Sequence, residues 1–268
     1  MNNMCDVKLP IDLSDERLRQ FFCQKYAHIN NVGWRPKLRL KWNYFLPSDY
    51  YEAIVDQLVV TESTSWLDVG GGRDVFPENS PLAIQLSRRC KRLVGIDPSE
   101  NILQNTFVHA RQMCLLEDSK LDAKFDLVTA RMVAEHVENP EAFVDAIYRN
   151  LESFGIVVIF TVDYWSVAPL VARFTPMWFH HFVKKWLWGS AEEDTFPVVY
   201  KMNTRRQLST LFSRRGFQEL SYSSLDDLSG FSMSSSILRI SLACRRILKL
   251  IGLPFPDRCI LAVYQKST

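Results

Sequence analysis

The stretch Ser65-Trp66-Leu67-Asp68-Val69-Gly70-Gly71-Gly72-Arg73 decides the fold of this chain of 268 residues. A short apolar run leads into an acidic residue and then into three consecutive glycines. Glycine has no Cβ, so the backbone can turn tightly here and a ligand can approach it closely. A second apolar run, residues 92–96, ends in Asp97. A carboxylate about 20 or more residues beyond a glycine-rich strand end is suited to bind ribose hydroxyls. The two features predict a nucleoside-containing cofactor at the carboxyl ends of a parallel sheet.

The glycines do not match a phosphate-binding loop. A dinucleotide site needs G-x-G-x-x-G leading directly into a helix, whose N-terminus holds the pyrophosphate. Val75 stands where the third glycine belongs, and the next helix is expected only at Ser80, as its cap, and Pro81. The G-x-x-x-x-G-K-[ST] pattern is also absent from the sequence. These features favour a nucleoside cofactor without pyrophosphate, of which S-adenosylmethionine is the common one.

Four segments resemble motifs of the class I S-adenosylmethionine-dependent methyltransferases, within about residues 60–165: Leu67 to Gly72, Val94 to Ser99, Phe125 to Ala130 and Val133 to Pro140. The resemblance implies an α/β fold, Rossmann-like and doubly wound, with a mostly parallel seven-stranded sheet and an antiparallel last strand. The family often has a further glycine near Asp74, so its absence predicts an altered loop. We expect a single methyltransferase domain over residues 1–268.

The pattern outside the motifs divides the chain into three parts. Residues 1–60 are expected to form an N-terminal helical segment. From residue 65 onward, strands alternate with helices, which predicts a parallel sheet covered on both faces. Residues 164–200 interrupt the alternation with many aromatic side chains, and we interpret them as an inserted helical lid over an apolar or aromatic substrate. A self-packed subdomain, a dimer contact and a membrane-surface segment are the alternatives.

Composition limits the other function classes. The formal net charge of +2 predicts no binding to nucleic acid, which usually requires a basic stripe or an added domain. The six cysteines have no zinc-type spacing, so we expect free thiols, no metal site and a cytoplasmic protein. The sequence has neither a signal-peptide pattern nor an apolar stretch of about 18 residues that would span a membrane.

The resemblance assigns roles in cofactor binding. Asp68 would hold the methionine amino group, and Asp97, followed by Pro98, would bind the ribose. The backbone of Gly70, Gly71 and Gly72 would approach the cofactor. Either Glu117 or Asp118 would meet the adenine amino group, or both lie in a solvated turn. Arg131 and Arg73 are suited to bind a carboxylate, or they are ordinary surface arginines.

The acceptor side is less defined by the sequence. His136 is the best candidate general base, because it follows the fourth strand and imidazole titrates near neutral pH; alternatively, it only shapes the pocket. The insert offers further candidates for substrate contact: Tyr164, Trp165, Trp178, His180 and His181. The helix expected over residues 237–251 carries basic residues that form either a surface for an anionic partner or a solvated face over a core stripe.

The leading interpretation is methyl transfer from S-adenosylmethionine to an oxygen, of a hydroxyl or a carboxylate, on a small or natural-product-like acceptor. Holding nucleophile and methyl group in line would supply most of the acceleration. An N-methyltransferase and a non-catalytic protein that retains the fold are the alternatives. A nicotinamide oxidoreductase is disfavoured by the missing third glycine. Which acceptor is used, and whether the chain self-associates, are not indicated by the sequence.

Overall fold

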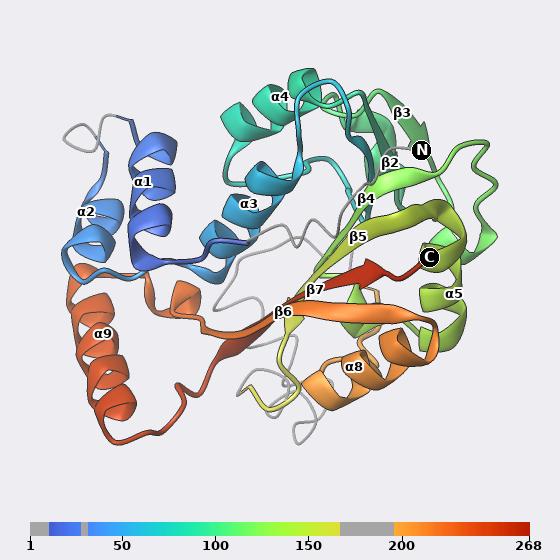
Figure 1. The fold of residues 1–268 in the computed structure, drawn as a ribbon. Helices are drawn as coiled ribbons and strands as arrows, with labels where there is room; N and C mark the ends of the chain where they lie inside the picture. The colour runs from blue at the N-terminus through green and yellow to red at the C-terminus, as the bar shows by residue number, and fades with distance from the viewer. Residues whose placement is uncertain (1–10, 28–31, 167–195) are drawn as a thin grey trace, which may run out of the picture.

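A computed structural model describes residues 11–27, 32–166 and 196–268 of the chain (Figure 1). Its centre is a seven-stranded sheet in the order β3-β2-β1-β4-β5-β7-β6. The strands are β1 Ser65–Val69, β2 Arg92–Ile96, β3 Ala110–Gln112, β4 Phe125–Arg131, β5 Leu151–Val162, β6 Phe217–Asp226 and β7 Arg258–Lys266. Neighbouring strands from β3 to β5 are parallel, whereas β7 is antiparallel to both β5 and β6. The expected doubly wound sheet with an antiparallel last strand is confirmed.

Helices cover both faces of the sheet because the buried strands are apolar on both sides. On one face α1 (Asp15–Lys25), α3 (Pro47–Leu58) and α4 (Ser80–Arg89) pack on a cluster that includes Trp66 and Phe160. On the other face α5 (Pro140–Asn150) and α8 (Arg205–Arg214) pack on a cluster that includes Leu67 and Tyr264. Trp66 and Leu67 are sequence neighbours, so their opposite placement follows the alternation of side chains along a strand.

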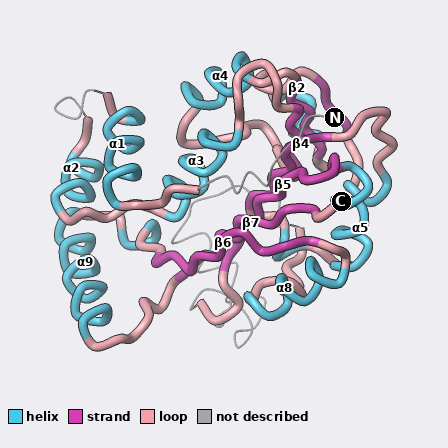
Figure 2. The backbone as a smooth tube through the Cα atoms, viewed as in Figure 1, coloured by secondary structure: helices cyan, strands magenta, loops and turns pink. Residues whose placement is uncertain are grey.

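A third cluster lies apart from the sheet faces. It joins α2 (Trp34–Lys41) to α9 (Ser235–Leu250), with Leu38 of α2 beside Leu238 and Leu242 of α9. In the tube view α1, α2 and α9 gather at one end of the sheet, opposite α5 and α8 (Figure 2). The connection into α3 and the loop that leads into α9 therefore meet at this end of the molecule.

Short 3₁₀ helices occupy several loops: η1 Glu100–Gln104, η2 Leu116–Asp118, η3 Ala134–His136 and η5 Ser229–Phe231. Although strands and helices were expected to alternate, only η1, and no α-helix, lies between β2 and β3 in the described structure. Helix α5 ends at Asn150, and β5 begins directly after it and includes Phe154 and Gly155. None of the described helices is both long and apolar enough to cross a membrane.

Candidate functional site

The triple glycine forms a tight turn at the carboxyl end of β1. Gly70 and Gly72 have φ angles of +73° and +41°, values that side-chain-bearing residues rarely adopt. A Cβ on Gly70 would lie 2.2 Å from Cγ2 of Val133, and a Cβ on Gly71 would lie 2.7 Å from Oδ2 of Asp68. Any side chain at these two positions would therefore displace the loop after β4 or the carboxylate of Asp68.

Asp97 ends β2 and is joined directly to this turn. Its Oδ2 accepts a hydrogen bond from the Gly72 amide at 2.9 Å, and its Oδ1 accepts one from the Ser99 amide at 2.8 Å. Pro98, which stands between Asp97 and Ser99 in the sequence, is exposed. An ionised carboxylate offers about four lone-pair sites, so two backbone contacts leave acceptor capacity for a diol.

The side chain of Asn105 holds the glycine turn in place, a role that the sequence pattern did not indicate. The side chain is fully buried, and its Nδ2 donates to the carbonyl oxygens of Gly71 and Gly72, each at 3.2 Å. Its Oδ1 accepts from the Phe107 amide at 3.0 Å. An asparagine just after a short 3₁₀ helix has no motif that would have singled it out.

The loop after the glycines is anchored by apolar side chains. Val75, at the position of the third glycine in a dinucleotide site, and Phe76 are both buried in the core beneath α3 and α4. Asn79, and not Ser80, caps α4, because its Oδ1 accepts from the Leu82 amide at 3.3 Å. The altered loop is therefore a packed segment that leads from the glycine turn to the helix.

Asp68 is a buried acid at the centre of the site. Its Oδ1 accepts a hydrogen bond from the Thr129 hydroxyl at 2.6 Å, and Thr129 in turn accepts one from the Trp66 indole at 2.7 Å. Burial raises the pKa of Asp68 to about 7, although the Thr129 hydrogen bond and the charge of Arg131 oppose the rise. A cationic group placed beside Asp68 would restore its ionised form, which suits the role expected for it toward an amino group.

The two acids expected to meet adenine lie in η2. This turn packs against α5, and Arg149 of that helix donates to the backbone oxygen of Glu117 at 3.2 Å. The Glu117 side chain is half-buried and that of Asp118 is exposed. Met113 and Cys114, not the acids, directly follow β3. Adenine contact by Glu117 or Asp118 therefore stays a prediction.

A hollow of about 200 Å³ lies between α3 and the carboxyl ends of β4 and β5. Arg131 and Met132 line it from β4, Phe160 from β5 and Tyr51 from α3. The Tyr51 ring stacks on that of Phe160 with centroids 5.3 Å apart. Its buried hydroxyl makes no hydrogen bond of full geometry to the described residues, although the Thr129 hydroxyl lies near enough to oppose the rise in its pKa. Burial, and then the charge of Asp68, raise the pKa of Tyr51, so the hydroxyl keeps its proton. Tyr51 is the main site residue that the sequence did not reveal.

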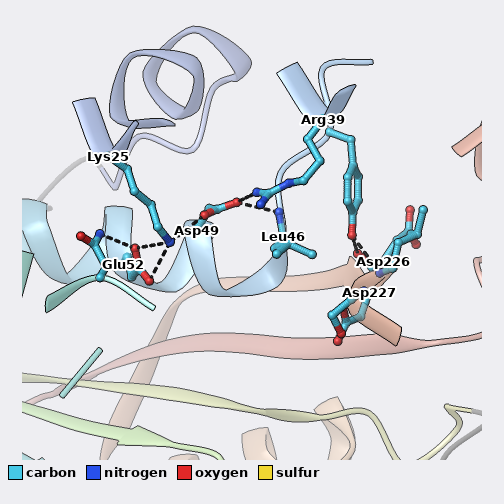
Figure 3. Close-up of polar contacts among 11 residues, drawn as sticks. Lys25, Arg39, Leu46, Asp49, Glu52, Asp226 and Asp227 are labelled. Carbon is cyan, nitrogen blue, oxygen red and sulfur yellow. Dashed lines mark hydrogen bonds and ion pairs between the residues drawn. The ribbon is translucent and has the colours of Figure 1, made fainter. Parts of the chain in front are cut away.

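Buried charges hold α3 in place (Figure 3). The ammonium of Lys25 contacts Asp49 at 3.1 Å and Glu52 at 2.9 Å, and Arg39 pairs with Asp49 from α2. Glu52 also accepts from the amide of Asn79 at 2.7 Å, so this group ties α1 and α2 to the start of α4. Burial alone lowers the pKa of Lys25, but the two carboxylates outweigh it and the pKa is raised. We call Lys25, Arg39, Asp49 and Glu52 the α3 ion cluster.

His136 ends η3 outside this hollow. Its Nδ1 lies 3.1 Å from the carbonyl oxygen of Pro197, so Nδ1 is assigned as the donor of this contact. Its neighbour Glu135 is buried and accepts from the Thr161 hydroxyl at 2.6 Å; burial raises its pKa. His136 is absent from the linings of both described hollows, so its part in catalysis stays a prediction.

A second hollow, of about 700 Å³, opens between the starts of α5 and α8. Tyr164 and Trp165 line it, and their rings meet edge to face at 5.0 Å. It lies on the α5 side of the sheet, away from Tyr51 and Arg131. Trp178, His180 and His181 fall outside the described residues, as does most of the proposed lid. No cluster of metal-ligating side chains occurs among the residues that the structure describes.

Known proteins resemble part of the chain in sequence. A ubiquinone biosynthesis O-methyltransferase of Psychrobacter cryohalolentis is 29% identical over 36% of this chain and 40% of its own length. Ribosomal RNA small subunit methyltransferase G of Lactococcus lactis is 29% identical over 46% of this chain and 58% of its own. The chain thus matches only about half the length of these curated relatives.

Solved structures share the fold at low sequence identity. A geranyl diphosphate C-methyltransferase of Streptomyces coelicolor, in complex with S-adenosyl-L-homocysteine, has a TM-score of 0.52 and 13% identity over 81% of this chain and 76% of its own. A methyltransferase structure from Listeria monocytogenes gives 0.51 and 14% over 83% and 99%.

The site fits S-adenosylmethionine on its own geometry. The glycine turn brings its backbone against Val133 and Asp68 with no room for Cβ atoms at Gly70 and Gly71, Asp97 retains acceptor capacity for a diol, and buried Asp68 gains from a nearby cation. A family model described as a methyltransferase domain matches residues 39–222, which include all of these residues and helix α3. The chain therefore belongs to the methyltransferase domain family, and within it to the class I S-adenosylmethionine-dependent methyltransferases.

Proposed function

We propose that the chain methylates an oxygen, of a hydroxyl or carboxylate, on a small acceptor bound in the hollow beside Tyr51. One observation carries the proposal: the buried Tyr51 hydroxyl, which makes no hydrogen bond of full geometry to the described residues, lines a hollow together with Arg131 at the end of β4 and Phe76 of the loop after the glycine turn. A polar group left unpaired in a buried place is costly unless a ligand satisfies it. The hollow therefore adjoins the cofactor edge and offers a donor to an acceptor oxygen.

Each residue has a task in this proposal. When bound, S-adenosylmethionine supplies an electrophilic methyl group on a sulfonium. Asp68 and Asp97 hold the cofactor, and the glycine turn lets it approach the backbone. Tyr51, kept protonated by burial, orients the acceptor oxygen, and the aromatic and apolar wall of Phe160 and Met132 excludes water. The proposed acceleration comes from alignment of nucleophile and methyl group.

Two observations support a small oxygen acceptor. The hollow's volume of about 200 Å³ suits a small group or one end of a larger molecule. Curated relatives from three organisms are named as ubiquinone biosynthesis O-methyltransferases. The acidic side chains Glu78 and Asp227 in the same lining favour a second candidate, an amine acceptor, because carboxylates attract an ammonium group. His136, the expected base, lies outside the hollow, so Asp227 is the better-placed acceptor of a proton.

Turnover of radiolabelled S-adenosylmethionine against phenols, carboxylic acids and amines tests the proposal. We expect a phenol or carboxylic acid to be methylated, and Tyr51→Phe to lower kcat/KM for it about tenfold, the loss of roughly one hydrogen bond. The affinity for S-adenosylhomocysteine, measured by calorimetry, should change little. Methylation of amines alone would select the second candidate. Binding of NAD without binding of S-adenosylhomocysteine would reject both.

A further inference from the structure

Helix α9 has two apolar faces, and the described residues cover only one of them. Leu238, Ser241 and Leu242 are buried against α2 and its flanking segment. A second row is exposed: Ile237, Ile240, Cys244, Ile247 and Ile251. Their spacings of three and four residues place them on one side of the helix, away from the buried face. We call these five residues the α9 outer stripe.

The stripe continues into an exposed apolar tip where the helix ends. Ile240 and Ile251 are 64% and 62% exposed, and Leu250 at the end of α9 is 80% exposed. Leu253, after the turn at Gly252, is 54% exposed. Single exposed leucines need no explanation, but a continuous row along a helix and past its end marks an interaction surface.

The charged side chains that α9 and α2 expose are all basic, and the acid beside α9, Asp226, is already paired with Arg245 at 2.7 Å. No acidic residue occurs between Asp227 and Asp257, while Arg239, Arg246 and Lys249 are exposed on α9. Helix α2, which packs against α9, also has no acidic residue, and it exposes Arg35 and Lys41. Both helices lie at the outer end of the molecule in Figures 1 and 2. The surface is therefore apolar and cationic together, although the chain as a whole has a formal charge of only +2.

The charges decide which partner fits. If two copies of the chain paired through their stripes, Arg239 and Arg246 of one copy would lie near the basic side chains of the other. Repulsion between these like charges opposes association. An anionic bilayer satisfies both properties, because apolar side chains enter the acyl boundary while arginines meet lipid phosphates. We propose that the α9 outer stripe docks the protein on the surface of an anionic membrane, with the helix lying in the plane of the interface.

The α9 outer stripe and the hollow beside Tyr51 are supported by the same two segments of the chain. The hollow is lined by Leu46 and Pro47, which follow α2, and by Asp227 and Ser229, which precede α9. The Tyr44 hydroxyl joins these segments, because it donates to Asp226 and accepts from the Leu228 amide at 2.9 Å. A membrane-docked molecule would thus hold the hollow's wall close to the bilayer. The docking proposal itself does not depend on the identity of the acceptor.

Flotation of the full chain with vesicles tests it. We expect binding to vesicles containing phosphatidylglycerol, weak binding to phosphatidylcholine vesicles, and release by salt. The paired substitutions Ile240→Ser with Ile247→Ser, and Arg239→Glu with Arg246→Glu, should each lower vesicle affinity about tenfold or more. Leu103→Ser, exposed on η1, and Arg214→Glu, exposed on α8, are matched controls that should bind normally.

Two exposed cysteines give an independent readout. Cys244 lies within the stripe and Cys23 lies on α1 outside it. Anionic vesicles should slow alkylation of Cys244 by a water-soluble reagent and leave Cys23 unchanged. Absence of vesicle binding by the wild-type chain, or equal losses in the control variants, overturns the proposal. A dimer in sedimentation that Ile240→Ser with Ile247→Ser dissociates would assign the stripe to self-association instead, which also overturns it.

Discussion

The glycine turn and helix α3 border the same site but are held in place by different kinds of contact. We call α3, with Tyr51 facing the hollow and the α3 ion cluster holding it, the α3 wall. The turn relies on short contacts with no buried ion pair: Asn105 and Asp97 bind its backbone, and space for Cβ atoms is lacking. The wall relies on four buried charges from α1, α2 and α3. A steric clash in the turn displaces only the neighbouring atoms, whereas a buried charge that loses its partner lowers the stability of the folded protein. Defects in the turn should therefore lower ligand affinity, and defects in the wall should lower stability.

The largest effect is expected from Lys25→Met. The change leaves Asp49 and Glu52 buried without their shared ammonium, which should lower the free energy of unfolding by about 3–5 kcal/mol. Chemical denaturation measures it. Arg17→Met removes a half-exposed partner of Asp56 and should cost less than about 1 kcal/mol. Equal losses in the two variants would show that the α3 ion cluster does not support the wall.

Gly71→Ala should lower ligand affinity more than it lowers stability. Its Cβ would come 2.7 Å from Oδ2 of Asp68, so the carboxylate or the turn must move. We expect S-adenosylhomocysteine to bind at least about tenfold more weakly, which is about 1.4 kcal/mol, with a smaller change in stability. Gly33→Ala is the control, since nothing lies within 4 Å of its Cβ. Unchanged affinity in Gly71→Ala would remove the turn from the cofactor site.

Asp97→Ala tests the ribose contact. Hydrogen bonds to a charged group contribute about 1.5–3 kcal/mol each, so calorimetry should show at least a tenfold loss of cofactor affinity in a folded protein. Asp97→Asn keeps one oxygen for the Gly72 amide and should fall between wild type and Asp97→Ala. Full affinity in both variants would place the ribose elsewhere.

The smallest effect is a pH dependence due to Asp68. Its pKa in the folded protein, about 7, lies above the unfolded value of 3.8, so the protonated acid stabilises the free protein at low pH. That contribution is complete below pH 3.8 and is lost as the pH rises through 7. A cationic ligand needs the ionised form, so cofactor affinity should fall about threefold between pH 7.5 and pH 6.5. Asp68→Asn should flatten this slope, and an unchanged slope in that variant would assign the titration to another group.

The sheet and the cofactor edge were predictable because their signals are local. Apolar runs that end in Gly70 or Asp97 mark strand ends directly, and the structure brings these ends together. Tyr51 was not predictable, because its position depends on how the α3 ion cluster orients a helix from another part of the chain. Asn105 was not predictable because an asparagine directly after a short 3₁₀ helix matches no motif, and its role comes from its contacts with Gly71 and Gly72. The cap of α4 was assigned one residue late because asparagine and serine cap equally well.

The position of β7 has a consequence for synthesis of the protein. This strand lies between β5 and β6, pairing antiparallel with both, although both precede it in the chain. While the nascent polypeptide emerges, β5 and β6 each present an open edge that nothing nearby in sequence can close. Such open strand edges can pair with other chains until β7 has been synthesised and has paired with both strands. The ribosome-bound intermediate should therefore be a chaperone client, and truncation before residue 258 should produce aggregates.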